Sequence, residues 1–375
     1  MRKKLAIIGA SFGQKPLFIK AKEMGIETHC FAWDEDAVCK EIADHFHPIS
    51  VMDNEKILEV CQKIKIDGVC TIATDLCVPA VSYVAEKMGL TGNRYKDSLA
   101  AVNKYLMRQA FLKSGVNVPR FTKTKSEKDI ELKGYNYPLI VKPTDRGASI
   151  GVMKVEKEVE LGQAVKRAIE LSFLKEAIIE EYIYGKEVCV LSISWNGKHY
   201  HLDIQDKETT GPPYYVEIGH HQPAKLSLEM QEKVKTETTK ALTALNINFG
   251  GSDNELMITE NGDVYIIEVN PRMGGDYTHT LVSLSTGYDF VKGVIDIALN
   301  RFQEPVINEQ NYSGMFYYSK GSEWVKNVIE NKEKYPEIIE TEITNELLST
   351  VQSSKDRCGF FIYKSDRKRT KDDYK

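Results

Sequence analysis

Long hydrophobic runs and paired cysteines are both missing from this sequence of 375 residues. No apolar stretch approaches the roughly 20 residues that cross a bilayer, so we expect no membrane partner. The first residues are Met-Arg-Lys-Lys, and the short apolar run after them turns to glycine and serine too early for a secretion signal. The seven cysteines are scattered without a Cys-x-x-Cys spacing, which predicts reduced thiols in the cytoplasm and no zinc site.

An excess of positive charge is missing too. The net charge is −4, and no segment is basic enough to suggest that nucleic acid is a partner. Hydrophobic residues make up 42% of the chain and charged residues 28%, which is typical of globular proteins. A chain of this length holds roughly two or three domains.

The N-terminal part alternates between short apolar strands and amphipathic helices. Strands are expected at residues 5–10, 27–32 and 68–73, with helices at 16–24 and 57–64. This alternation predicts the α/β class with a doubly wound parallel sheet. The turn Gly9–Gly13 carries only GxxxG, so NAD binding is disfavoured. The alternative is a glycine turn that faces a small substrate.

A small mobile domain is expected to open after Pro119. A helix from Tyr95 to Ser114, ending at Gly115, precedes it and carries Lys104 in its middle. Within the domain, a strand at 137–143 presents Lys142, and a Gly/Ser loop at 145–151 follows. Such loops cradle phosphate oxygens with backbone N–H groups, and a lysine adds a point charge. A plain hairpin loop is the alternative.

Two further segments carry carboxylates at strand ends. Residues 177–191 form strand, turn and strand, with carboxylates Glu180 and Glu187 at the two ends. Backbone groups of such a hinge can meet a purine edge, and Glu187 would meet the sugar hydroxyls. Residues 252–258 and 264–270 flank the turn Asn261–Asp263 and form a hairpin. Pairing of those strands brings Glu255 opposite Glu268, while Asn270 and Arg272 alternate with Glu268 on one face. Two carboxylates and an amide oxygen suit Mg²⁺, and an ordinary surface hairpin with salt bridges is the alternative.

The order of these pieces resembles the ATP-grasp superfamily of ligases over roughly residues 1–300. The matching motifs are Lys104, Lys142-Pro143, the Gly loop, Glu180-Glu-Tyr-Ile-x-Gly-x-Glu187, Glu255 and Glu268-x-Asn270-Pro-Arg272. The resemblance implies an α/β ATP-grasp fold with an N-terminal Rossmann-like domain, a small α+β lid domain and a larger core domain. The expected boundaries are 1–100 for the first domain, 101–300 for the ATP-grasp domain (119–190 lid, 191–300 core), and 301–375 for a small β-rich domain with a disordered charged tail at 364–375.

The same resemblance implies ATP and Mg²⁺ as cofactors, with Mn²⁺ as a substitute. The residues implied to bind ATP are Lys104, Lys142, Gly147, Ala148, Ser149, Glu180, Glu181, Ile183 and Glu187. Those implied to bind the metal are Glu255, Glu268 and Asn270. Arg272 would act in catalysis as donor to the oxyanion of acyl transfer, and a salt bridge from Arg272 to Asp276 or Glu268 is the alternative.

A Pro/Gly-rich stretch at 210–224 is expected to be a long irregular loop, either on the surface or at the active site. Its Tyr-Val-Glu217-Ile-Gly-His220 sequence, followed by a proline, is similar to the branch of the superfamily that includes L-amino-acid ligases. Arg272-Met-Gly-Gly275-Asp is also similar to that branch. By this resemblance Glu217, His220 and Gly275 would face an amino-acid substrate.

The resemblance implies an ATP-dependent carboxylate–amine ligase that forms an amide or peptide bond through an acyl phosphate and releases ADP and phosphate. Its partners would be small carboxylates and amines, and a homodimer is compatible with it. A carbamoyl-phosphate-type or carboxylating enzyme that uses bicarbonate is the first alternative. A nucleotide-binding regulator without catalysis is the second.

Overall fold

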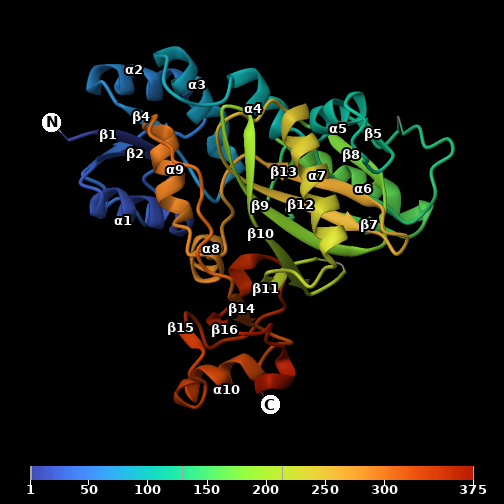
Figure 1. Cartoon of the computed structure of the whole chain (residues 1–375). Coiled ribbons are helices and arrows are strands. Elements are labelled where there is room, and N and C mark those ends of the chain that lie inside the picture. Colours follow the sequence, from blue (N-terminus) through green and yellow to red (C-terminus); the bar gives the residue numbers. More distant parts are fainter. Residues whose placement is uncertain (1, 129, 213, 375) are drawn as a thin grey trace.

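The computed structural model describes residues 2–128, 130–212 and 214–374, and its strands form three sheets (Figure 1). Pro213 of the expected loop and Lys375 of the expected tail lie outside the described residues. All seven cysteines are buried free thiols, as the sequence predicts. Within the described ranges, no helix is both long enough and apolar enough to cross a membrane.

The N-terminal sheet is parallel throughout and has the order β3-β2-β1-β4. Its strands are β1 (Lys4–Ile8), β2 (Glu27–Ala32), β3 (His45–Pro48) and β4 (Gly68–Cys70). Side chains alternate between faces, so Leu5 and Ile7 pack with α1 (Lys15–Glu23), while Ala6 and Ile8 pack with α2 (Asn54–Ile64) and α3 (Val78–Met88). The doubly wound sheet is therefore confirmed, with β3 as an additional edge strand.

The single helix expected from Tyr95 to Ser114 is wrong. Two helices, α4 (Tyr95–Ala101) and α5 (Lys104–Lys113), take its place. Asn103 has an extended backbone, and its side chain accepts hydrogen bonds from the N–H groups of Tyr105 and Leu106 at 3.1 Å each. Such a cap starts a new helix, so Lys104 is the first residue of α5 and not a mid-helix residue.

The small sheet is antiparallel, with the order β5-β8-β6-β7. Its strands are β5 (Phe121–Thr124), β6 (Leu139–Pro143), β7 (Met153–Val155) and β8 (Ala177–Glu181), and α6 (Glu158–Leu171) covers one face. The Gly/Ser loop joins β6 to β7. The next strand, β9 (Lys186–Trp195), crosses the expected lid boundary at residue 190 and belongs to the large sheet.

The large sheet has eight strands in the order β13-β12-β9-β10-β11-β14-β16-β15. The remaining members are β10 (Lys198–Thr209), β11 (Glu217–Gln222), β12 (Gly250–Ile258), β13 (Val264–Asn270), β14 (Tyr312–Tyr318), β15 (Ile338–Ile343) and β16 (Gly359–Ser365). Helix α7 (Leu228–Ala244) covers the face that carries Val188 and Val190. The other face carries Leu191 and Ile193, and it meets α8 (Thr278–Thr286), α9 (Phe290–Ala298) and the N-terminal domain.

The expectation of an irregular loop throughout 210–224 is wrong, because Glu217–Gln222 forms β11. This strand pairs with β10 on one side and β14 on the other. His220, His221 and Gln222 are buried there. The pairing of β11 with β14 attaches the C-terminal strands to the large sheet, so residues 301–375 extend that sheet (Figure 1).

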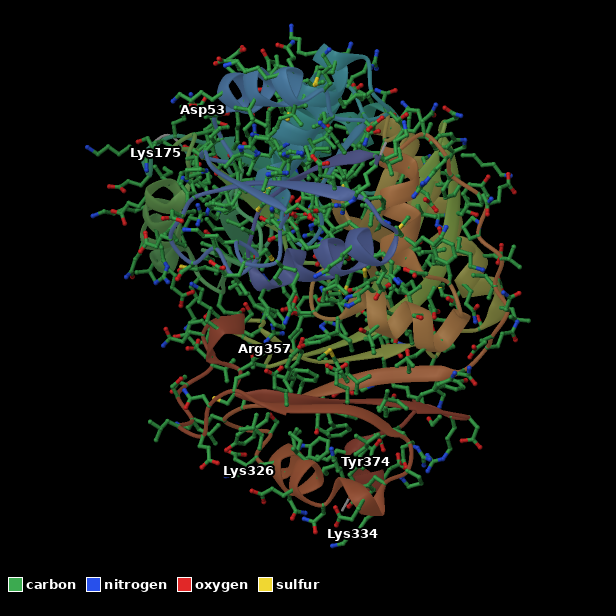
Figure 2. All side chains as sticks on the ribbon, turned by 90° about the vertical axis from the view of Figure 1, so that its left-hand side faces the viewer. Asp53, Lys175, Lys326, Lys334, Arg357 and Tyr374 are labelled. Carbon is green, nitrogen blue, oxygen red and sulfur yellow. The ribbon has the colours of Figure 1, made fainter. Side chains whose placement is uncertain are left out.

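The expected disorder of the tail is also wrong for its described residues. Lys364 lies within β16, and Lys371–Tyr374 forms a 3-10 helix. Tyr374 is only 3% exposed, and its ring lies 5.0 Å from Phe361 and 5.3 Å from Tyr335 between centroids. Tyr374 lies beside α10 (Trp324–Glu330) in the layer formed by β14, β15, β16 and α10, which we call the C-terminal layer (Figure 2). One buried aromatic side chain therefore anchors a segment that is otherwise charged.

Replacing Tyr374 by alanine should destabilise the C-terminal layer by about 3 kcal/mol, since truncation of a buried aromatic leaves a cavity. The measurement is urea unfolding followed by tryptophan fluorescence, because Trp324 stacks against Tyr374. Lys371→Ala, on the exposed side of the same turn, serves as the control and should change stability by less than about 0.5 kcal/mol. Equal effects from the two variants would contradict the anchoring role.

Candidate active site

The hairpin β12–β13 places its polar side chains on one face of the large sheet. Glu255 pairs directly with Glu268, and Asp253 pairs with Asn270. Antiparallel partners share a face, as do residues two apart on a strand, so these four side chains form one patch. The predicted pairing of Glu255 with Glu268 is confirmed, although β13 ends at Asn270 and does not reach Arg272.

Three carboxylates from three strands surround the ammonium group of Lys207 on β10. Lys207 Nζ lies 2.8 Å from Oε1 of Glu255, 3.2 Å from Oε1 of Glu187 and 3.4 Å from Oε1 of Glu217. The Lys207 side chain is only 7% exposed. Burial lowers the pKa of Lys207, but the three carboxylates outweigh burial and raise it well above its ordinary value. We call these four residues the Lys207 cluster, in which one ammonium group faces three carboxylates.

Glu217 and His220 share a face through a β-bulge. Thr209 pairs with Glu217 and Lys207 pairs with His220, while only Glu208 stands opposite the residues between them. The extra residue in β11 reverses the alternation at this point. Two candidate substrate residues three positions apart therefore both lie on the side of Lys207. The sequence did not single out Lys207 as a site residue, because Lys207 stands in a charged Asp-Lys-Glu run that is typical of an exposed strand.

Lys104 joins the metal candidates to the Gly/Ser loop. Its Nζ donates to Oε1 of Glu268 at 2.8 Å and to the carbonyl oxygen of Arg146 at 2.7 Å. Its backbone N–H donates to the carbonyl of Thr144 at 2.7 Å. One buried lysine at the start of α5 thus contacts both β13 and the loop after β6.

A second charged cluster holds β8 against β13. Glu180 accepts from Nε of Arg108 at 2.6 Å through one oxygen and pairs with Lys142 Nζ at 2.7 Å through the other. Arg108 is fully buried and also donates to the carbonyl of Ile267 at 2.6 Å. Burial raises the pKa of Glu180, but Arg108 and Lys142 outweigh it and lower that pKa to about 2. Sequence analysis missed Arg108, which lies in an amphipathic helix without a distinguishing motif.

Glu181, at the end of β8, already makes hydrogen bonds within the protein. The backbone N–H of Glu181 donates to the carbonyl of Arg120 at 3.0 Å, and the Glu181 side chain accepts from the N–H of Asn136 at 3.2 Å. Ile183 lies beyond the end of β8, between it and β9. The predicted contacts of these residues with a purine stay predictions.

The Gly/Ser loop is fixed at its base and exposed at its tip. The Asp145 carboxylate accepts from the N–H groups of Phe173 and Leu174 at 3.2 and 2.7 Å. Ala148 and Ser149 are exposed and adopt left-handed conformations, with φ of 53° and 54°. A Cβ on Gly147 would lie 2.8 Å from the Asp75 carboxylate, so any other residue here would require the Asp75 side chain to move.

Arg272 connects the core to the N-terminal domain. Its Nε lies 3.0 Å from Oδ1 of Asp75, and a terminal nitrogen donates to Oδ2 of the same residue at 3.0 Å. The other terminal nitrogen lies 3.5 Å from Asp253. Burial lowers the pKa of Arg272, but the two aspartates outweigh burial and raise it. The alternative of a salt bridge from Arg272 named Asp276 or Glu268 as its partner, and that choice of partners is wrong, because Arg272 pairs with Asp75 and Asp253.

Asp276 instead pairs with Arg357 from the C-terminal segment. The two terminal nitrogens of Arg357 donate to the Asp276 carboxylate at 2.8 and 2.7 Å, and the guanidinium lies 3.8 Å from the centre of the Tyr317 ring. His220 Nε2 lies 3.5 Å from the same carboxylate. Burial raises the pKa of Asp276, but His220 and Arg357 outweigh burial and lower it far below its usual value. Figure 2 shows Arg357 where the C-terminal layer meets the rest of the molecule.

A chain of contacts links these groups across the sheet. The carbonyl of Glu217, a member of the Lys207 cluster, accepts from Arg357 at 3.5 Å. The carbonyl of Gly275 accepts from the N–H and hydroxyl of Thr278 at 2.9 and 2.7 Å, and a Cβ on Gly275 would lie 3.6 Å from Ala73. These contacts join Glu187, Glu217 and Glu255 through Lys207, Glu268 to the Gly/Ser loop through Lys104, and His220 to Arg357 through Asp276. They add Asp75, Lys207 and Arg357 to the candidate residues. Sequence separation hid these three from the sequence analysis.

The donors available at the hairpin suit Mg²⁺. Glu255 and Glu268 each contact a lysine through one oxygen, and no bond to the second oxygen is found within the part of the chain that the structure describes. Asn270 is 6% exposed and stands beside them. Nε2 of His220 faces the Asp276 carboxylate at 3.5 Å, while Nδ1 is buried without a hydrogen-bond partner among the described residues. Buried polar groups are normally satisfied, so Nδ1 is the His220 atom left for a polar ligand.

Replacing Lys207 by methionine should leave three carboxylates, whose side chains are 23–30% exposed, without their shared cation and cost about 1–3 kcal/mol of stability at pH 8. The pKa of Glu187, already raised by burial, and that of Glu217 would both rise. Groups with raised folded-state pKa lose stability as pH increases, so the deficit should be larger at pH 8 than at pH 5. Excess Mg²⁺ should recover part of it.

Thermal unfolding at both pH values, with and without Mg²⁺, measures these effects. Lys207→Arg keeps the charge and should retain most of the stability. Lys63→Met breaks an exposed pair with Glu59 and should cost less than about 1 kcal/mol. A Lys207→Met variant as stable as the native chain at pH 8 would show that the cluster needs no internal cation.

Comparison with known proteins identifies one domain and several relatives. A family model described as ATP-grasp domain matches residues 135–280. The chain is 31% identical over 208 residues to D-alanine--D-alanine ligase of Geotalea uraniireducens, a match that covers 52% of this chain and 64% of that protein. It is 25% identical over 326 residues to alanine--anticapsin ligase of Bacillus amyloliquefaciens, covering 76% of this chain and 68% of that one.

Solved structures show the same fold over nearly the whole chain. L-amino acid ligase from Bacillus licheniformis has a TM-score of 0.82 at 23% identity, covering 98% of this chain and 94% of that one. Phosphoribosylglycinamide synthetase from Anaerococcus prevotii has a TM-score of 0.77 at 23% identity, covering 100% and 96%. By sequence, the chain spans only 59–64% of the length of the D-alanine--D-alanine ligases that it matches.

Proposed function

From the premise that the chain carries an ATP-grasp domain and the ATP-grasp fold, we propose that it is an ATP-dependent carboxylate–amine ligase. It joins an amino-acid-like carboxylate to an amine and releases ADP and phosphate. The observation that carries this proposal is the single face on which the Glu255–Glu268 pair, Lys207 and the buried fork of Arg272 lie. This face combines oxygen donors for a hard cation with fixed cationic donors for phosphate and carboxylate oxygens.

The chemistry needs an activated carboxylate. A carboxylate oxygen attacks the γ-phosphorus of ATP, the bond from that phosphorus to the β,γ-bridging oxygen breaks, and ADP leaves with the bond pair. The amine then attacks the acyl carbon of the acyl phosphate, loses a proton, and displaces phosphate. Lys104 and Lys142 would hold phosphate oxygens, with the N–H groups of Gly147, Ala148 and Ser149 above them.

Mg²⁺ held by Glu255, Glu268 and Asn270 would neutralise charge on the phosphates during transfer. Glu180, the backbone of Glu181 and Ile183, and Glu187 would contact the purine and its sugar. Glu187 pairs with Lys207, and Glu180 pairs with Lys142. Contacts of Lys142 with phosphate and of Glu187 with sugar hydroxyls would therefore compete with these internal ion pairs.

The charged groups around Glu217 and His220 favour an amino-acid-like substrate. Glu217 offers a carboxylate for an ammonium group, and His220 offers Nδ1, which has no hydrogen-bond partner among the described residues. Arg357 and Asp276 stand beside them as a charged pair of opposite signs. An amino acid carries both signs on neighbouring atoms, so this set suits it better than bicarbonate.

The direct test is a screen of L-amino-acid pairs for ADP and phosphate release, with bicarbonate with or without ammonia as the competing set. The proposal predicts phosphate release that requires both an acid and an amine, and a condensed product by mass spectrometry. Glu268→Gln removes one metal ligand and its charge and should lower turnover to near background. Turnover with bicarbonate alone would favour the carboxylating alternative.

Arg272→Lys should lower the ligation rate by about 10²–10³-fold, because removal of an oxyanion donor has that effect. Lysine keeps the charge but loses the fork that spans Asp75. ATP affinity should be nearly unchanged, measured by titration calorimetry alongside the rate at saturating substrates. Arg301→Lys, in an ion pair with Asp296 outside the site, is the matched control. Loss of ATP affinity together with the rate would contradict the assigned role.

A further inference from the structure

Three histidines and a glutamate gather on one face of the N-terminal sheet, away from the candidate active site. Glu27 and His29 lie two residues apart on β2, and His45 and His47 lie two residues apart on the edge strand β3. The parallel register pairs His29 with His45. Because residues two apart share a face, all four side chains project from the same side. Three of the chain's eight histidines are thus concentrated on two short strands.

The ligand atoms are close enough to share one ion. Oε1 of Glu27 lies 3.0 Å from Nε2 of His29 and 3.6 Å from Nε2 of His45. One ligand atom from each of the three residues lies within 4.8 Å of the others. Ligands about 2.0–2.2 Å from a zinc ion are about 3–4 Å apart. The His45 side chain is 54% exposed, so a small rotation can bring its nitrogen into that range.

His47 is placed to select the right tautomer of His29. Nδ1 of His29 lies 3.2 Å from Nε2 of His47, whose ring stacks on Phe31 with centroids 4.6 Å apart. When Nδ1–H donates to His47, the lone pair of His29 Nε2 is directed toward Glu27. Metal-bound histidines in proteins commonly donate their second nitrogen in this way.

The charge balance of the cluster also calls for a cation. Among the described residues, the only ion-pair partners of Glu27 are His29 and His45. Lys4 stands next to Glu27 in the register of β1 and β2, but its ammonium group donates to the carbonyl of Ile64 at 3.2 Å. Asp44, just before β3, is already paired with Arg2.

We propose that Glu27, His29 and His45 bind a divalent transition-metal ion of the zinc class, with water completing the coordination on the exposed side. Two imidazoles and one carboxylate form a donor set that such ions prefer over Mg²⁺. The ion ties the edge strand β3 to β2. It therefore stabilises the N-terminal domain and is separate from the hard-cation donors at Glu255 and Glu268.

The test is calorimetric titration of the metal-stripped full-length protein with Zn²⁺ in excess Mg²⁺, which occupies oxygen-donor sites without competing for imidazole. We expect one Zn²⁺ per chain. His47→Ala should weaken binding by about 10–100-fold, and His45→Ala should weaken it further. Glu41→Gln removes an exposed carboxylate just upstream of β3 and should leave binding unchanged. His45 is exposed, so its replacement leaves the fold intact.

X-ray absorption at the zinc edge provides a second readout. The proposal predicts a nitrogen and oxygen shell at about 2.0–2.2 Å with two imidazoles, and loss of one imidazole in His45→Ala. Zn²⁺ should also raise the melting temperature of the native chain but not that of His45→Ala. Unchanged Zn²⁺ affinity in both His45→Ala and His47→Ala, or no binding in the native chain, would overturn the proposal.

Discussion

One buried ammonium group keeps three carboxylates together on the inner face of the large sheet. Without Lys207, the side chains of Glu187, Glu217 and Glu255 would bring three negative charges together while only 23–30% exposed. Such an arrangement would cost about 1–3 kcal/mol. The chain balances it with a lysine on the strand between β9 and β11. Any ligand that enters must exchange one of these contacts for one of its own.

Pairing of a cationic side chain with a carboxylate also connects the sheets of the molecule. Arg272 on the core reaches Asp75 on the N-terminal domain, and Lys104 reaches both Glu268 and the Gly/Ser loop. Arg108 joins Glu180 of the small sheet to the backbone of β13. Each contact crosses from one sheet or loop to another, so phosphate or carboxylate oxygens that replace an internal partner would also alter how these parts hold together. This coupling gives a physical route from binding to closure of the exposed loop tip.

Local patterns in the sequence predicted the parts of the site that lie on one element. The turn at Asn261–Asp263 and the alternation of polar residues were enough to pair Glu255 with Glu268. The strand ending at Lys142 and the loop after it follow from an apolar run and a glycine. The helix break at Asn103 was missed because Tyr95–Ser114 is amphipathic throughout, and only the cap reveals that Lys104 begins a new helix.

Residues that depend on long-range packing could not be found in this way. Asp75 and Arg272 are separated by 197 positions, and Arg357 meets Asp276 only because β11 pairs with β14. The strand at Glu217–Gln222 was hidden by the Gly/Pro residues before it, and its burial comes from neighbours on both sides. Tyr374 shows the reverse case, in which composition predicts disorder but one buried aromatic side chain packs against several rings and holds the segment in place.

The central claim is that this surface activates a carboxylate by phosphorylation before an amine attacks. An acid substrate labelled with ¹⁸O in its carboxylate tests this most directly, because the oxygen that attacks the γ-phosphorus leaves with phosphate. Mass spectrometry of the products should find one ¹⁸O in each phosphate released and none in ADP. Unlabelled phosphate, or release of AMP and pyrophosphate, would contradict the acyl-phosphate route.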